Sequence, residues 1–200
     1  MKQVAIAVAV AALFVTPALA APRVGQPAPA FTAVDSNGER HSLSDFAGRT
    51  VILEWHNPGC PFVQKHYQGN MQKTQAAAIA DMAVWLTVNS GAPGKQGHMD
   101  GKAANARIAR DKARPTAYLL DPAGTIGRAY DARTTPQMFV IDGKGVLRYA
   151  GAIDDKPTAD VADIAEARNH VLAALSDMKA RKPVAVTTSR PYGCAVKYSD

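Results

Sequence analysis

The chain has 200 residues, of which 47% are hydrophobic and 20% charged, and its formal net charge at pH 7 is +6. A chain of this length can bury one real core, so its stability does not depend on a disulfide, and two domains are not expected. Basic and acidic residues are interspersed, and no Lys/Arg stripe with interleaved aromatic residues occurs, which argues against a nucleic-acid partner.

Residues 1–20 have the features of a secretory signal peptide. Lys2 precedes an apolar stretch, and a small-x-small cleavage site ends at Ala20. A transmembrane anchor needs about 20 predominantly apolar residues, whereas this segment is short and Pro17 interrupts it. We therefore expect a soluble, exported periplasmic protein without stable membrane insertion after cleavage. Its compartment would allow paired cysteines to stay oxidised.

The remaining sequence alternates strand patterns with helix patterns. A hairpin is predicted around the Asn37-Gly38 turn signal. Strands are predicted at residues 31–34, 39–42, 50–55, 82–88, 116–120, 137–141 and 146–149. Helices are predicted at residues 43–46 (one turn), 61–81 with an interruption near Gly69, and 100–113.

A last long helix is predicted from an apolar face, with Thr158 or Asp160 as its N-cap. The face consists of Val161, Ile164, Val171, Leu172, Leu175 and Met178. Strands that alternate with helices and end in a hairpin and a helix indicate an α/β protein with a mixed sheet covered on both faces.

Cys60 is the strongest candidate for chemistry because it stands where a strand is followed by a helix. Pro61 suits the first helical position, since its missing N–H would have no partner there. A thiol at the first turn of a helix lies near unpaired N–H groups and the positive end of the helix dipole, which favour thiolate. We expect a Cys60 pKa below the free value of about 8.5 and a sulfur within reach of a foreign sulfur.

The order of elements, with a Thr-Pro pair before the final hairpin, resembles the thioredoxin fold. Residues 24–31, with the turn at 35–38, are similar to the N-terminal hairpin of the redoxin branch, which includes peroxiredoxins and thiol-specific antioxidant proteins. The Gly-Cys-Pro-Phe-Val turn and the tail Tyr-Gly-Cys-x-Val-Lys-Tyr at residues 192–198 resemble a peroxiredoxin-like group of exported thioredoxin-family proteins. The resemblance covers residues 24–198 and implies a thioredoxin-like fold and an oxidoreductase acting on thiols or disulfides.

The resemblance also implies roles for single residues. Cys60 matches the attacking cysteine of the thioredoxin Cys-x-x-Cys motif, and Val63 stands where the second cysteine would be. Glu54 matches the buried acid, which could relay a proton if burial raises its pKa; an ordinary solvent-facing strand residue is the alternative. Thr135 and Pro136 match the cis-proline turn, whose backbone edge would receive an extended, cysteine-bearing partner.

The missing local second cysteine leaves three sources for a resolving thiol: Cys194, another protein or a small thiol. A structural disulfide between Cys60 and Cys194 is the competing interpretation, because paired cysteines in exported proteins are usually structural. Either pairing requires Cα atoms no more than about 7 Å apart. A dedicated peroxidase ranks lower, because neither the Pro nor the Thr of the peroxiredoxin motif Pro-x-x-x-Thr-x-x-Cys is present, whether Cys60 or Val63 is aligned with its cysteine.

Metal binding is the alternative of a different class. Residue types that suit copper are present, and copper chaperones for oxidase assembly share this fold. The candidate ligands are Cys60, His66 and Cys194, with Met71, His98 and Met99 as further residues of suitable type. No second thiol lies in the Cys60 loop, so no metal is included in the main interpretation.

Three further side chains have two interpretations each. Arg133 could line the cleft or form a surface salt bridge, and Trp55 and Phe62 could form an apolar docking rim or belong to the core. The predicted organisation is a signal peptide at residues 1–20, a redoxin domain at 21–183 and a tail carrying Cys194 at 184–200. No organic cofactor is implied, and the partners expected are protein or small-molecule thiols and disulfides.

Overall fold

Strand β3 (Val51–Trp55) is buried along its whole length and lies inside the sheet. It pairs in parallel with β4 (Val84–Asn89) and antiparallel with β7 (Gln137–Ile141), so both of its backbone edges are satisfied. A computed structural model describes residues 21–199. The predicted signal peptide lies outside the described residues.

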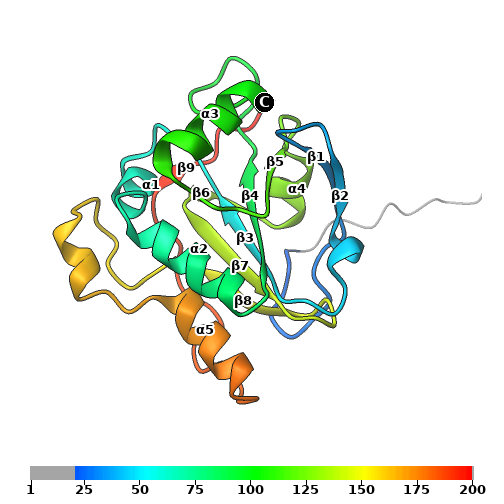
Figure 1. Cartoon of the computed structure of the whole chain (residues 1–200), viewed down its shortest axis with the longest axis vertical. Coiled ribbons are helices and arrows are strands. Elements are labelled where there is room, and N and C mark those ends of the chain that lie inside the picture. Colours follow the sequence, from blue (N-terminus) through cyan, green and yellow to red (C-terminus); the bar gives the residue numbers. More distant parts are fainter. Residues whose placement is uncertain (1–20, 200) are drawn as a thin grey trace, which may run out of the picture.

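The sheet has seven strands in the order β2-β1-β5-β4-β3-β7-β8 (Figure 1). Its other strands are β1 (Thr32–Asp35), β2 (Arg40–Ser42), β5 (Ala117–Leu120) and β8 (Leu147–Gly151). The helices are η1 (Leu43–Phe46), α1 (Pro61–His66), α2 (Asn70–Ala80), α3 (Gly101–Asp111), α4 (Thr125–Ala129), η2 (Ala162–Ala165) and α5 (His170–Lys179). The predicted mixed sheet with helices on both faces is confirmed.

Alternation along β3 divides the core into two apolar layers. Ile52 packs with residues of α2 and α5 on one face. Leu53 and Trp55 pack with α4 and the β1–β2 hairpin on the other. Glu54 points into the same layer as Ile52, where it is fully buried.

The predicted last helix is wrong at its start. Residues 162–165 form only the single turn η2, and α5 begins after Asn169, whose side chain accepts a hydrogen bond from the N–H of Leu172 at 3.0 Å. Thr158 instead bonds the Asp163 side chain. Val161 is therefore exposed, and only the residues from 171 onward pack on the sheet.

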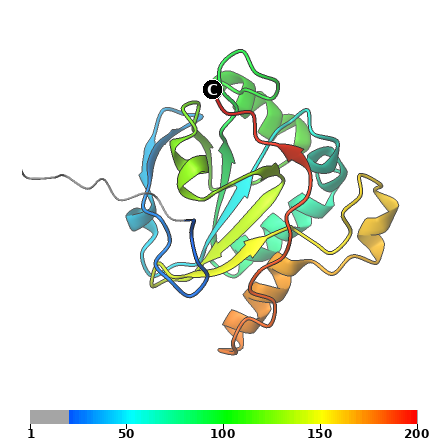
Figure 2. The same cartoon turned by 180° about the vertical axis from the view of Figure 1, so that it is seen from behind.

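Two features were not predicted: helix α4 and a second, two-stranded sheet. The small sheet joins β6 (Thr134–Thr135) to β9 (Cys194–Ala195), with Thr135 opposite Cys194. The tail reaches this point by running along edge strand β8, where the N–H of Ala150 bonds the Thr187 carbonyl at 3.1 Å (Figure 2). The tail thereby brings Cys194 to the end of the sheet where Cys60 lies.

Candidate active site

Cys60 is the N-cap residue of α1 and the last residue of a turn that begins at Asn57. The Asn57 carbonyl accepts the N–H of Cys60 at 3.1 Å, and its side-chain oxygen accepts the N–H of Gly59 at 2.9 Å. Pro61 occupies the first helical position, as predicted. The turn between β3 and α1 therefore holds the thiol at a fixed point beside the sheet.

Cys60 is completely covered, so the predicted sulfur that a partner can reach is not what the structure shows. Its exposed fraction is 0%, and its Sγ donates a hydrogen bond to the Thr135 carbonyl at 3.0 Å. The Thr135–Pro136 peptide bond is cis and lies opposite the thiol, as the resemblance implied. The Cys60 sulfur thus faces the backbone of β6 instead of solvent.

Cys194 lies against Cys60 because β9 pairs with β6. Both cysteines are free thiols, and the Cys194 side chain hydrogen-bonds that of Cys60. The pairing is extended by the N–H of Val196, which donates to the Arg133 carbonyl at 3.0 Å. Cys194 is half-buried and Cys60 is buried, so Cys194 is the more accessible sulfur.

The two thiols have opposite pKa shifts. Burial raises the pKa of Cys60, but hydrogen bonds from the Cys194 side chain, Thr135 and the N–H groups of Val63 and Cys194 stabilise its thiolate and bring the pKa below the ordinary value. The four hydrogen bonds together outweigh the effect of burial on the Cys60 pKa. Burial and the neighbouring Cys60 raise the pKa of Cys194 to about 11.

Glu54 is a buried acid and not a solvent-facing residue. One carboxylate oxygen accepts from the Tyr67 hydroxyl at 2.8 Å, and the other accepts from Trp85 Nε1 at 2.8 Å, Thr87 Oγ1 at 3.1 Å and Gln75 Nε2 at 3.5 Å. Burial raises its pKa, although these four donors act in the opposite direction. Glu54 is therefore a buried candidate for proton exchange, and it lies on β3, the strand that precedes the Cys60 turn.

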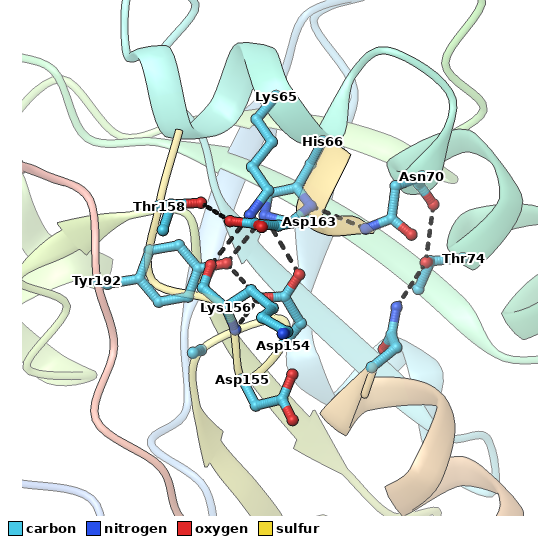
Figure 3. A network of polar contacts seen from close by, with 12 residues as sticks. Lys65, His66, Asn70, Thr74, Asp154, Asp155, Lys156, Thr158, Asp163 and Tyr192 are labelled. Carbon is cyan, nitrogen blue, oxygen red and sulfur yellow. Dashed lines mark hydrogen bonds and ion pairs between the residues drawn. The ribbon is translucent and has the colours of Figure 1, made fainter. Parts of the chain in front are cut away.

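Tyr192, two residues before Cys194, is held by His66 and Asp154; we call these three residues the tyrosine clasp (Figure 3). The Asn70 amide donates to His66 Nδ1 at 2.8 Å, so His66 Nε2 carries the proton and donates to the Tyr192 hydroxyl at 3.1 Å. The Tyr192 hydroxyl in turn donates to Asp154 Oδ1. The clasp joins the tail to α1, the helix whose N-cap residue is Cys60.

The alternative ligand set of Cys60, His66 and Cys194 does not converge on one point. Both ring nitrogens of His66 are engaged by Asn70 and Tyr192. Within residues 21–199, one group of side chains lies close enough to share a metal ion, namely Asp35, Glu39 and His41 in the N-terminal hairpin. Asp35 there accepts the backbone N–H groups of residues 37 and 39, which gives it a structural role in the turn.

The three side chains with two interpretations are also placed. Arg133 is exposed and pairs with Asp131 Oδ2 at 2.8 Å, so it is a surface salt bridge. Trp55 belongs to the core, where its Nε1 donates to Ser90 at 3.0 Å. Phe62 contacts the ring of Tyr192 edge-on, with centroids 5.8 Å apart, so it faces the tail.

Sequence reasoning missed Tyr192, Asp154 and Asn57 as residues that shape the site. The Tyr-Gly-Cys motif of the tail resembles that of a known protein group, and its tyrosine is the sequence feature that could have indicated this contact. Asp154 gave no local signal because its partners are 88 and 38 residues away along the chain, at His66 and Tyr192.

Known protein families, curated proteins and solved structures include matches to this chain. Residues 24–150 match the AhpC/TSA family. Two Mycobacterium tuberculosis proteins, named Putative peroxiredoxin Rv2521 and Putative peroxiredoxin MT2597, are each 28% identical over 159 residues, which cover 77% of this chain and 93% of theirs. The hypothetical protein SMc02350 from Sinorhizobium meliloti 1021 has a similar structure, with a TM-score of 0.75 at 22% identity over 90% of this chain and 97% of that one.

A second solved structure identifies the fold class. The thioredoxin domain of thiol-disulfide oxidoreductase BVU-2223 from Bacteroides vulgatus has a TM-score of 0.53 at 21% identity, over 72% of this chain and 96% of that domain. The predicted thioredoxin-like fold is confirmed.

Acid should destabilise the protein through His66. Burial lowers the His66 pKa from 6.5 to about 4. Between these two pH values His66 is therefore protonated in the unfolded chain and neutral in the folded chain. The free energy of unfolding therefore falls as the pH drops through this window, by about 3 kcal/mol at most for this group. Urea unfolding at pH 7 and pH 4 should show a smaller fall for His66→Asn than for the wild type. An equal fall in both proteins would contradict the assignment.

Glu54 should have the opposite dependence. A raised folded pKa means that the folded protein loses stability as the pH rises through that pKa, because the ionised carboxylate is buried. Glu54→Gln cannot ionise, so its stability relative to the wild type should increase as the pH rises from the ordinary glutamate pKa of 4.5 toward the raised folded pKa. Glu54→Leu, which leaves the donors unpaired, should be less stable at every pH. If the difference in unfolding free energy between the Gln variant and the wild type does not change with pH, burial does not raise the pKa of Glu54.

Proposed function

This chain belongs to the AhpC/TSA family and is an oxidoreductase that acts on thiols, and we propose that it is an exported thiol–disulfide oxidoreductase in which Cys60 is the nucleophile and Cys194 the resolving thiol. The observation that carries the proposal is the contact between the two thiols beside Thr135. One thiol there has a lowered pKa and the other a raised pKa.

In the proposed cycle, the Cys60 thiolate attacks one sulfur of a partner disulfide. A bond forms between Cys60 and the partner, the partner's S–S bond breaks, and the leaving thiolate takes a proton from solvent. Cys194, as thiolate, then attacks the Cys60 sulfur, which forms the Cys60–Cys194 disulfide and releases the partner as a reduced thiol. A donor dithiol returns the protein to its reduced form.

The high pKa of Cys194 suits this order of events. Part of the increase comes from the hydrogen bond and the charge that Cys60 presents to it. Once Cys60 is in a mixed disulfide, that charge is gone, and Cys194 ionises more readily. Cys194 is thus kept protonated in the reduced protein and becomes a better nucleophile at the step where it is needed.

Glu54 is proposed to exchange protons with the site. Burial raises the pKa of Glu54, which favours the protonated carboxyl group over the carboxylate. Among the described residues its hydrogen bonds go to the side chains at 67, 75, 85 and 87 and not to Cys60. Glu54 is therefore assigned an indirect role.

Peroxide is proposed only as a secondary substrate. A thiolate reacts with peroxide, and two relatives are named as peroxiredoxins. Neither register of the peroxiredoxin motif, however, has the Pro or the Thr before the reactive position. The thiol pair itself supports disulfide exchange more directly.

The domain organisation remains a proposal. We assign residues 1–20 to an export signal, residues 21–183 to the redoxin domain and residues 184–200 to the tail. Along residues 21–199, no helix has the length and apolar character needed to cross a membrane.

Single-cysteine variants test the roles of the two thiols. With glutathione disulfide, Cys194→Ser should accumulate a mixed disulfide on Cys60, because no resolving thiol is present. The wild type should proceed to an internal disulfide, and Cys60→Ser should react more slowly because burial still raises the pKa of the Cys194 thiol. Intact-mass spectrometry follows each species.

Two results would count against the proposal. Equal reaction rates for the two single-cysteine variants would show that Cys60 has no activated thiolate. An internal disulfide that forms once and then resists excess dithiothreitol would favour the structural staple. The Cys194→Ser variant also serves to trap partners from an extract of exported proteins.

A further inference from the structure

The backbone edge of β6 is already occupied in the reduced protein. The tail pairs with it antiparallel, Thr134 with Ala195 and Thr135 with Cys194. This is the edge that an extended, cysteine-bearing partner needs in order to bring its sulfur to Cys60. The tail therefore holds the partner's position, with its own cysteine at the reactive place.

Gly193 is required for this approach. Its φ is +131°, and a Cβ added there would lie 2.0 Å from the Thr135 carbonyl oxygen and 2.7 Å from the carbonyl carbon. The atoms that an added Cβ would meet belong to the backbone, so no side-chain movement could relieve the clash. Any strand that follows the same path over β6 needs a glycine directly before its cysteine.

Tyr192 enters a site that recognises both its ring and its hydroxyl (Figure 3). The Phe62 ring meets it edge-on at 5.8 Å, and the Lys65 ammonium lies 5.9 Å from its centroid. The hydroxyl accepts from His66 and donates to Asp154. These groups favour tyrosine at the second position before the cysteine.

Asp154 shows that this site is built for a polar ligand. Its side chain is almost fully buried, and among the described residues its second oxygen, Oδ2, accepts no hydrogen bond. The first oxygen receives the Tyr192 hydroxyl and the N–H of Lys156, the latter at 3.0 Å. Removing the tyrosine hydroxyl would leave this carboxylate less satisfied.

We propose that residues 192–194 are an intramolecular copy of the partner segment, so that the site takes an extended peptide of sequence Tyr-Gly-Cys after the tail has been displaced. The inference rests on the proposed function, since it assumes that Cys60 attacks a partner's sulfur. The same contacts that position Cys194 for resolution cover Cys60 while the tail is docked, and a matching segment competes with the tail for them.

A peptide-exchange experiment tests the proposal. The probe is the octapeptide Arg-Pro-Tyr-Gly-Cys-Ala-Val-Lys, blocked at both ends, with its cysteine joined to thionitrobenzoate through a disulfide. Attack by Cys60 joins the peptide to the protein and releases coloured thionitrobenzoate, so atoms and electrons balance. The protein is the full-length double variant Gly193→Ala/Cys194→Ser, whose tail is excluded from the edge and whose sole thiol is Cys60.

The double variant should release thionitrobenzoate at least about tenfold faster than Cys194→Ser alone, a factor equivalent to about 1.4 kcal/mol of tail docking. Peptides with Phe for Tyr, or Ala for Gly, should each react about tenfold more slowly than the parent peptide, again about 1.4 kcal/mol. Gly69→Ala/Cys194→Ser is the matched control, because Gly69 also has a positive φ, +120°, with nothing within 4 Å of an added Cβ.

Each outcome decides a different point. Equal rates for the three peptides would overturn the recognition of Tyr-Gly-Cys. A Gly193→Ala variant no faster than its Gly69→Ala control would overturn displacement of the tail. If Cys60 fails to react in every variant even with free dithiobisnitrobenzoate, yet reacts in urea, the proposed function itself fails.

A milder variant covers the case in which Gly193→Ala does not fold, which circular dichroism would reveal. Tyr192→Phe/Cys194→Ser keeps the ring and loses only the hydroxyl, so it should speed release with the parent peptide above that of Cys194→Ser. Tyr130→Phe/Cys194→Ser removes a tyrosine hydroxyl whose hydrogen bond goes to the Pro29 carbonyl and not to the tail, so it should not. Equal rates for these two variants would overturn the role of the clasp.

Discussion

The pairing of the tail with β6 is the interaction on which the site depends. It brings Cys194 against Cys60, closes the Cys60 sulfur off from solvent and supplies two of the donors that stabilise its thiolate. Burial alone would raise the pKa of a thiol and make it inert. Cys60 remains ionisable because the group that covers it is also a hydrogen-bond donor.

Buried polar groups on either side of this contact follow the same physical rule, that a group removed from water must find partners. Glu54 has four donors within the core, yet burial still raises its pKa. His66 and one carboxylate oxygen of Asp154 form hydrogen bonds with Tyr192, which belongs to the tail. The tail is therefore part of the folded structure and shares polar partners with α1, and its release would leave buried polar groups exposed or unpaired.

This arrangement combines protection with readiness. A thiolate that is open to solvent is exposed to oxidation, whereas the Cys60 sulfur has no exposed surface. A second aromatic residue, Tyr198, anchors the tail beyond the cysteine by donating to the Ala132 carbonyl at 2.6 Å. Cys194 is thus held between two tyrosines, and access to Cys60 becomes a matter of competition for one short backbone edge.

Local patterns in the sequence determined most of the framework. The apolar run at residues 51–55, the Gly69 break and Pro61 after Cys60 act over one or two turns of chain, so strands, helix starts and the place of the thiol were predicted correctly. The start of the last helix was predicted too early because an apolar face continues across Asn169. Only the hydrogen bond from the Leu172 N–H to the Asn169 side chain shows where the helix begins. The burial of Cys60, the meeting of Thr135 with Cys194 and the Tyr192–Asp154 bond were decided by tertiary structure alone, because each joins segments between 38 and 75 residues apart, and no local propensity encodes such a contact.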